Sequence, residues 1–249
     1  AGRLGPVAVS ALGLVMMPAI FNAGLMALVH RGAMSTVARL SGLKLPERMR
    51  ECAAQALLLN LILSLLFASV GWLLSPHLLR LTGGEGEVLE LATHYLRLLY
   101  LGYPLMSTAM VLDGLFIGLS DTKTPFRLQI LGVAVNTALN AFTVLVLGAG
   151  ITGIALASIF SRALAGAIAA TLLAKRLGEP RHLLPTLHEL KPKIKLWGEF
   201  LRIGAPVALS IAFYAGIFMI LNRVLGQFGQ IAYGVVGVGI RGIESIGFM

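Results

Sequence analysis

The sequence predicts an all-α polytopic membrane protein, and its composition, its hydropathy and the length of its apolar segments each indicate this class. The chain has 249 residues, of which 57% are hydrophobic and only 12% are charged, whereas soluble domains carry about 25% charged residues. The mean hydropathy is +0.86. The apolar segments exceed the about 9–11 residues of a membrane β-strand and lack strict alternation, so we expect helices.

The apolar segments define the expected elements. Crossing a bilayer as a helix takes about 20 mostly apolar residues. Segments of sufficient length span residues 6–29, 52–74, 92–117, 125–147, 151–174 and 203–225. A further one begins near residue 231 and is still apolar at Met249. The sequence therefore predicts six complete membrane spans and part of a seventh.

The connecting segments alternate in charge. Basic residues gather in segments 31–51, 118–127 and 175–202, whereas the opposite connections carry Arg80 with three glutamates or the uncharged stretch 148–150. Short cytoplasmic loops are enriched in Lys and Arg, so we expect the basic segments in the cytoplasm and a multi-pass protein of the cell (inner) membrane. Residues 190–200 are expected to form an interfacial amphipathic helix. The formal net charge of +9 is thus a topology signal, and no nucleic-acid partner is expected.

An internal repeat indicates two lobes. Four small residues recur at a constant offset of 224 positions, namely Gly2/Gly226, Gly5/Gly229, Ala8/Ala232 and Gly13/Gly237. Such parallel repeats occur in secondary transporters. We expect a parent of about twelve helices and about 450 residues, with one helix before Ala1 and about five after Met249. Residues 1–175 would form helices 2–6 of the first lobe, residues 176–202 a cytoplasmic inter-lobe linker, and residues 203–249 helices 7–8, which begin the second lobe.

Three motifs carry a resemblance to a known family. They are Gly118-Leu-Ser-Asp121-Thr-Lys123-Thr-Pro125, then Asn136-x-x-x-Asn140 followed by Gly153-Ile-Ala-Leu-Ala-Ser158, and Leu201-Arg-Ile-Gly204-Ala-Pro206. In this order they resemble the loop between helices four and five, polar positions on helices five and six, and the start of helix seven in the multidrug and toxic compound extrusion (MATE) family. Without the family, the first motif is a well-made turn in which Asp121 and Thr122 cap the next helix.

The resemblance implies a fold and an activity. The fold is a MATE-type parallel repeat of two six-helix lobes. The activity is efflux of amphipathic, mostly cationic organic compounds by alternating access, driven by Na⁺ or H⁺ antiport. No cofactor beyond the coupling ion is implied. The expected partners are small-molecule organic cations and the lipid bilayer, and the protein is expected to be a monomer and not an enzyme.

Polar residues inside the spans are the candidate site, because they are costly in a membrane. Asn136 and Asn140 lie one turn apart on one helix, and Ser158 and Arg162 lie one turn apart at a similar depth on the next. We interpret them as a cation or substrate pathway, although interhelical hydrogen bonding would also explain the asparagines and the serine. Arg162 needs a partner, and no acid of this chain is expected at its depth. The hypothesis is that it, or the asparagines, face an acid that MATE proteins often carry on their first helix.

The chain departs from the family pattern at two positions. Many prokaryotic members have Asp where Asn140 stands, and that carboxylate is linked there to ion coupling. An amide cannot carry a proton, although Asn140 could still ligate sodium. Tyr214 stands where one branch has a glutamate, which favours a DinF-like branch.

The remaining acids leave alternatives open. Asp113 is expected near the cytoplasmic end of its helix, in a structural role. Glu244 either pairs with Arg241 on its own helix or serves the second lobe as an acid that exchanges a proton or binds a cation. Glu244 therefore joins the predicted pathway.

The other functional classes are less well supported. A flippase of the same superfamily, moving a lipid-linked oligosaccharide or polysaccharide, should have a strongly cationic cavity, whereas this lobe shows only Arg162 at mid-depth. No catalytic constellation is visible within the spans. The single cysteine and the scattered histidines predict no metal site.

Overall fold

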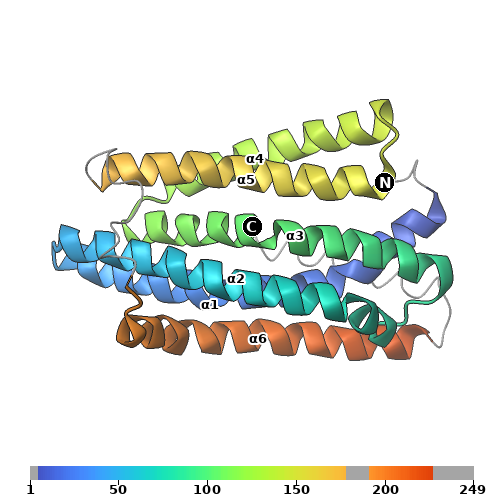
Figure 1. The fold of residues 1–249 in the computed structure, drawn as a ribbon, viewed down its shortest axis with the longest axis horizontal. Coiled ribbons are helices and arrows are strands. Elements are labelled where there is room, and N and C mark those ends of the chain that lie inside the picture. Colours follow the sequence, from blue (N-terminus) through green and yellow to red (C-terminus); the bar gives the residue numbers. More distant parts are fainter. Residues whose placement is uncertain (1–4, 178–190, 227–249) are drawn as a thin grey trace.

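The computed structural model describes residues 5–177 and 191–226, and every regular element in them is helical. The elements are α1 (Pro6–Gly42), α2 (Pro46–Leu81), α3 (Gly86–Gly118), α4 (Lys123–Ala141), the π-helix η2 (Phe142–Val146), α5 (Gly150–Arg176) and α6 (Ile194–Gly226). They run roughly parallel to one long axis, with successive helices in opposite directions (Figure 1). The predicted all-α class is confirmed.

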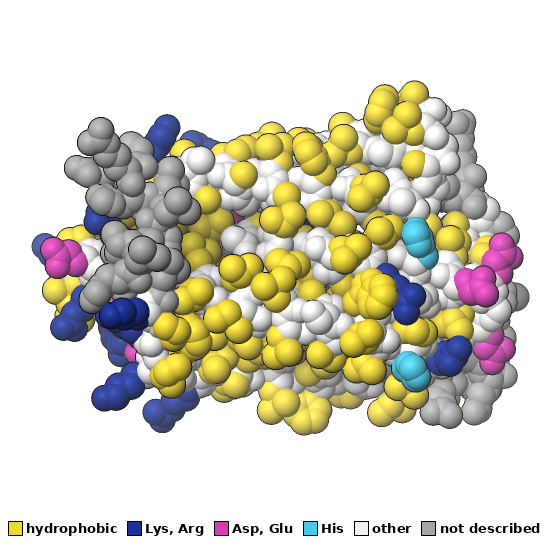
Figure 2. Space-filling view, viewed as in Figure 1, with side chains coloured by type: hydrophobic (Ala, Val, Ile, Leu, Met, Phe, Trp, Pro, Cys, Tyr) yellow, Lys and Arg dark blue, Asp and Glu magenta, His cyan; other side chains and the backbone are white. Residues whose placement is uncertain are grey.

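The surface of the bundle matches a membrane environment. Six helices of the described part are long and apolar enough to cross a bilayer. Hydrophobic side chains cover the flank in view, and Lys and Arg gather at one end, where α1 turns into α2 (Figure 2). This is the end that the sequence predicts to be cytoplasmic. The chain is therefore a multi-pass membrane protein.

Helix ends differ from the prediction at the basic end. The expected 31–51 loop is mostly helical, because α1 continues to Gly42 and α2 begins at Pro46 after a turn in which Lys44 has a φ of 54°. Likewise α6 begins at Ile194 rather than near residue 203. The described part of the expected 190–200 interfacial helix is therefore the start of a spanning helix. Charged side chains end a hydropathy window, but they do not end a helix that leaves the bilayer.

Small residues set the packing of α1. The helix contacts both α3 and α6. At Gly204 of α6 a Cβ atom would collide with the backbone of Leu28, and at Gly32 of α1 it would collide with the backbone of Phe200. Close backbone approach of this kind is how small residues join membrane helices. The cytoplasmic half of α6 is thus held tightly against α1.

The helices α4 and α5 form a second part of the bundle. They pack against each other, and α5 also packs along α3, whereas α4 has few contacts with α3. Exposed apolar side chains on α4 include Phe126 and Ile130. Of the polar residues predicted as a site, Asn136 and Asn140 lie on α4, and Ser158 and Arg162 lie on α5.

Candidate functional site

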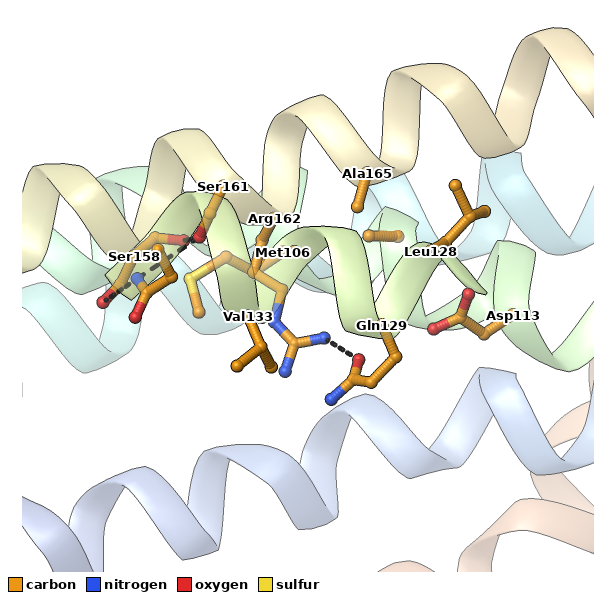
Figure 3. Close-up of a pocket in the computed structure, with 12 residues that line it drawn as sticks. Met106, Asp113, Leu128, Gln129, Val133, Ser158, Ser161, Arg162 and Ala165 are labelled. Atoms are coloured by element: carbon orange, nitrogen blue, oxygen red, sulfur yellow. Dashed lines mark hydrogen bonds between the residues drawn. The ribbon is translucent and has the colours of Figure 1, made fainter. Parts of the chain in front are cut away.

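A pocket of about 260 Å³ lies between α3, α4 and α5 (Figure 3). Its lining combines apolar side chains with amide, hydroxyl, guanidinium and carboxyl groups. The lining residues are Met106, Ala109, Asp113, Leu128, Gln129, Gly132, Val133, Asn136, Ser158, Ser161, Arg162 and Ala165. Of the five predicted site residues, Asn136, Ser158 and Arg162 therefore line one pocket.

Hydrogen bonds connect the polar residues of α4 and α5. The Asn136 Nδ2 atom donates to Ser158 Oγ and to Ser161 Oγ, at 3.3 Å each. The Asn140 Nδ2 atom donates to Asn136 Oδ1 at 2.9 Å. Both hydroxyls donate in turn to backbone carbonyls of their own helix. The predicted clustering of Asn136, Asn140 and Ser158 is thus present, while its role remains a prediction.

Ser161 belongs to this network, although it was not among the predicted site residues. It follows Ser158 by three residues, so both hydroxyls face the same side of α5. That spacing is the signal that could have found it. Ser161 is 3% exposed, which places the inner end of the network away from solvent.

One acceptor in the network has no partner in the described part of the chain. The Oδ1 atom of Asn140 is buried and accepts no hydrogen bond from a described residue. A buried polar atom left in this way is costly. An amide oxygen is a hard ligand of the type that calcium ions take, and carbonyl oxygens also coordinate sodium ions in transporters. Within the described residues, His, Cys, Asp and Glu form no group of three or more that could hold a metal ion.

Arg162 has two polar neighbours in the pocket. Its guanidinium donates to the Gln129 Oε1 atom at 2.9 Å, and it acts electrostatically on half-buried Asp113 of α3. Asp113 thus lines the same pocket as Arg162, an arrangement that the sequence did not predict. Depth counted along the sequence placed Asp113 near the interface, but it did not reveal that α3 turns this carboxyl group toward α5.

Asp121, in the turn before α4, fastens the cytoplasmic ends of two helices. Its Oδ1 accepts the backbone N–H of Thr124 at 3.0 Å, and its Oδ2 accepts the Thr124 hydroxyl at 2.8 Å. Arg176, at the end of α5, forms an ion pair with the same carboxylate. The Thr124 hydrogen bonds and then the Arg176 charge hold the pKa of Asp121 below its usual range. Capping by Asp121 is confirmed, whereas Thr122 makes no capping hydrogen bond.

Part of the predicted site lies outside the residues that the structure describes. Glu244, its neighbour Arg241 and the expected seventh span lie outside the described residues. The second copy of the repeat is described only at Gly226. These predictions stay untested.

Comparison with known proteins gives consistent matches. A family model described as MatE matches residues 1–142. The probable multidrug resistance protein YoeA of Bacillus subtilis (strain 168) is 26% identical over 218 residues, which cover 84% of this chain and 46% of that protein. The probable multidrug resistance protein NorM of Geobacillus kaustophilus (strain HTA426) is 28% identical over 189 residues, which cover 74% and 41%. The chain thus spans less than half the length of these curated relatives.

Solved structures share the fold. An inward-facing multidrug resistance MATE family transporter of the MOP superfamily is 27% identical, with a TM-score of 0.82 over 92% of this chain and 52% of that one. A MOP superfamily transporter from Pyrococcus furiosus, for which reverse polarity of the binding pocket suggests a different function, is 26% identical. Its TM-score is 0.85, over 96% of this chain and 53% of that one.

Proposed function

This chain belongs to the MatE family, and from that premise we propose that it supplies most of one lobe of a cation-coupled multidrug efflux antiporter. MATE proteins are transporters and not enzymes. The compounds exported would be amphipathic, mostly cationic organic molecules, and the driving ion Na⁺ or H⁺. Alternation of two lobes between outward-open and inward-open states would carry them across the cell membrane.

The proposed organisation follows the predicted lobes. Residues 1–175 form the N-terminal lobe, residues 176–202 link it to the second lobe, and residues 203–249 begin that lobe. Because α6 starts at Ile194, the last part of the linker is already helical. The contacts of α6 with α1 are then contacts between the two lobes.

The pocket between α3, α4 and α5 is the observation that supports this proposal most. It joins an amide–hydroxyl network to apolar walls and to two residues of opposite charge. Polar groups at membrane depth mark substrate or ion pathways. The Asn140 Oδ1 atom, which has no hydrogen-bond partner among the described residues, supports this atom as a ligand of sodium at the outer end of the network, because an amide cannot carry a proton.

The charge of the pocket favours drug export over the flippase alternative. A cavity that binds an anionic lipid-linked saccharide should be strongly cationic. Here Arg162 shares the pocket with Asp113, and these two are the only charged residues among those that line it in the described part of the chain. Their formal charges cancel, which does not fit a strongly anionic substrate.

Drug susceptibility of whole cells tests the proposal. The complete transporter, expressed in bacteria that lack their main efflux pumps, should raise the minimal inhibitory concentration of cationic dyes several-fold. A variant with Asn136→Leu and Asn140→Leu, matched for membrane abundance, should lose this protection. Unchanged susceptibility with abundant membrane protein would contradict the proposal, and rescue of a strain deficient in lipid-linked saccharide flipping would support the alternative.

A further inference from the structure

Two opposite charges share the pocket without pairing directly. Asp113 comes from α3 and Arg162 from α5, and no ion pair between them is found within the described residues. In the close-up, the hydroxyls of Ser158 and Ser161 lie at one end of the pocket, Asp113 lies at the other, and the Arg162 guanidinium with Gln129 lies between (Figure 3). The pocket thus has separate sites for groups of opposite charge.

Each charge remains available to a bound molecule. The Arg162 guanidinium cannot lose its proton, and the hydrogen bond it donates at 2.9 Å goes to the neutral Gln129 amide. A carboxyl group and a guanidinium at membrane depth gain energy from any opposite charge brought beside them. His30 of α1 also packs against α3, at Gly114. Its Nδ1 atom contacts the Met110 carbonyl oxygen at 2.7 Å.

We propose that Asp113 recognises the cationic group of the exported compound and that Arg162 limits how much positive charge the pocket accepts. This inference rests on the proposed function and adds to it the residues that set charge selectivity. One positive group beside Asp113 is balanced, whereas a second one meets the fixed charge of Arg162. The pocket would therefore prefer monovalent organic cations or zwitterions to dications and to anions.

The size of the pocket agrees with this role. Drug-sized ligands fill pockets of about 300–1,000 Å³, whereas this pocket measures about 260 Å³. It suits the charged end of an amphipathic molecule. Met106, Leu128 and Val133 in the lining supply apolar contacts for the adjacent hydrocarbon, and the soft Met106 side chain adapts to different shapes.

Export of matched fluorescent compounds tests the proposal. The complete transporter in sealed proteoliposomes would be assayed with a monovalent cation, a dication and an anion of similar size. Asp113→Asn should lower export of the monovalent cation by about tenfold or more, since unit charges a few ångströms apart interact strongly at an effective dielectric constant near 20. It should also raise export of the anion. Arg162→Gln should raise export of the dication.

Control variants separate charge from folding. Asp113→Glu keeps the carboxyl group and should keep the wild-type preference. Glu90→Gln, near the start of α3 and outside the pocket lining, removes an acid elsewhere and should leave the preference unchanged. The charge-exchanged pair Asp113→Arg with Arg162→Asp should restore part of the monovalent-cation export that Asp113→Arg alone abolishes.

The outcomes distinguish this inference from the proposed function. If the wild type exports none of the compounds, the proposed function fails and the inference with it. If the wild type exports the cation but Asp113→Asn lowers cation and anion export equally, the inference is wrong while the function stands. The inference would also be wrong if Asp113→Asn lost gradient-driven export but kept downhill movement of the cation. Asp113 would then serve the coupling ion.

Discussion

Replacing Gln55 with leucine should loosen the attachment of α6 to the rest of the bundle. Gln55 of α2 is fully buried, at 0% exposure. Its Nε2 donates to the Lys191 carbonyl oxygen at 2.9 Å, and its Oε1 accepts hydrogen bonds from the Lys193 backbone N–H at 3.0 Å and from Trp197 Nε1 at 2.8 Å. One side chain therefore ties the residues at the start of α6 to the first lobe.

The expected loss of stability follows from these three hydrogen bonds. Each contributes a net of about 1 kcal/mol to stability, so Gln55→Leu should lower the free energy of unfolding by about 3 kcal/mol. Burying the indole N–H of Trp197 without a partner adds to this loss. By contrast, the nearby ion pair of Arg39 with Glu199 is largely exposed, and exposed pairs contribute at most about 1 kcal/mol.

Reversible unfolding in mixed micelles with increasing denaturing detergent measures the free energy of unfolding of both variants, Gln55→Leu and Glu199→Gln. Gln55→Leu should shift the free energy of unfolding by about three times as much as Glu199→Gln, which serves as the matched control in the same region. A loss below about 1 kcal/mol for Gln55→Leu would refute the reasoning. It would mean that the hydrogen bonds of Gln55 are replaced by water when the side chain is removed.

Three further predictions concern other parts of the structure. Gly204→Val should disrupt the contact between α6 and the Leu28 backbone and lower the melting temperature clearly, whereas Gly216→Val, where an added Cβ meets nothing within 4 Å, should have little effect; equal shifts would refute the tight contact. Because the pKa of Asp121 is lowered in the folded state, its stabilising effect is complete above the unfolded value of about 3.9 and is lost as pH falls through the lower folded value. Asp121→Asn should therefore reduce stability at pH 7 and flatten the acid limb of a stability–pH curve, and an unchanged limb would contradict the assignment. Asn140→Leu removes the Oδ1 atom that has no hydrogen-bond partner in the described part of the chain, and it should abolish any protection by sodium against thermal unfolding, measured against sodium-free potassium buffer. Sodium protection that survives the substitution would place the ion elsewhere.

The sequence was sufficient to predict the fold because bilayer crossing depends on long apolar segments, and these are visible without knowledge of packing. Helix ends were predicted less well. Arg31 and Arg39 end the first apolar segment, yet the helix continues to Gly42 because nothing in between breaks it. Where a helix leaves the membrane and where it ends are separate questions, and hydropathy answers only the first.

The candidate site was partly predictable for a similar reason. Asn136, Asn140 and Ser158 share a depth and lie on consecutive helices, so counting turns was enough to place them together. Asp113 lies on a helix that is not adjacent to α5 in sequence, and its approach to Arg162 depends on how α3 and α5 pack. Gln55 was missed because its partners are mainly backbone atoms of a segment expected to be a linker.

The central claim, ion-coupled export of organic cations, is tested most directly by efflux from sealed proteoliposomes that contain the complete transporter. A fluorescent monovalent cation would be followed under an imposed sodium gradient and, separately, under an imposed proton gradient. We expect export against the cation's own concentration gradient under at least one of the two imposed gradients. This export should collapse when an ionophore dissipates the imposed gradient. Export that only follows the cation's own gradient, or none in vesicles shown to be sealed, would contradict the claim.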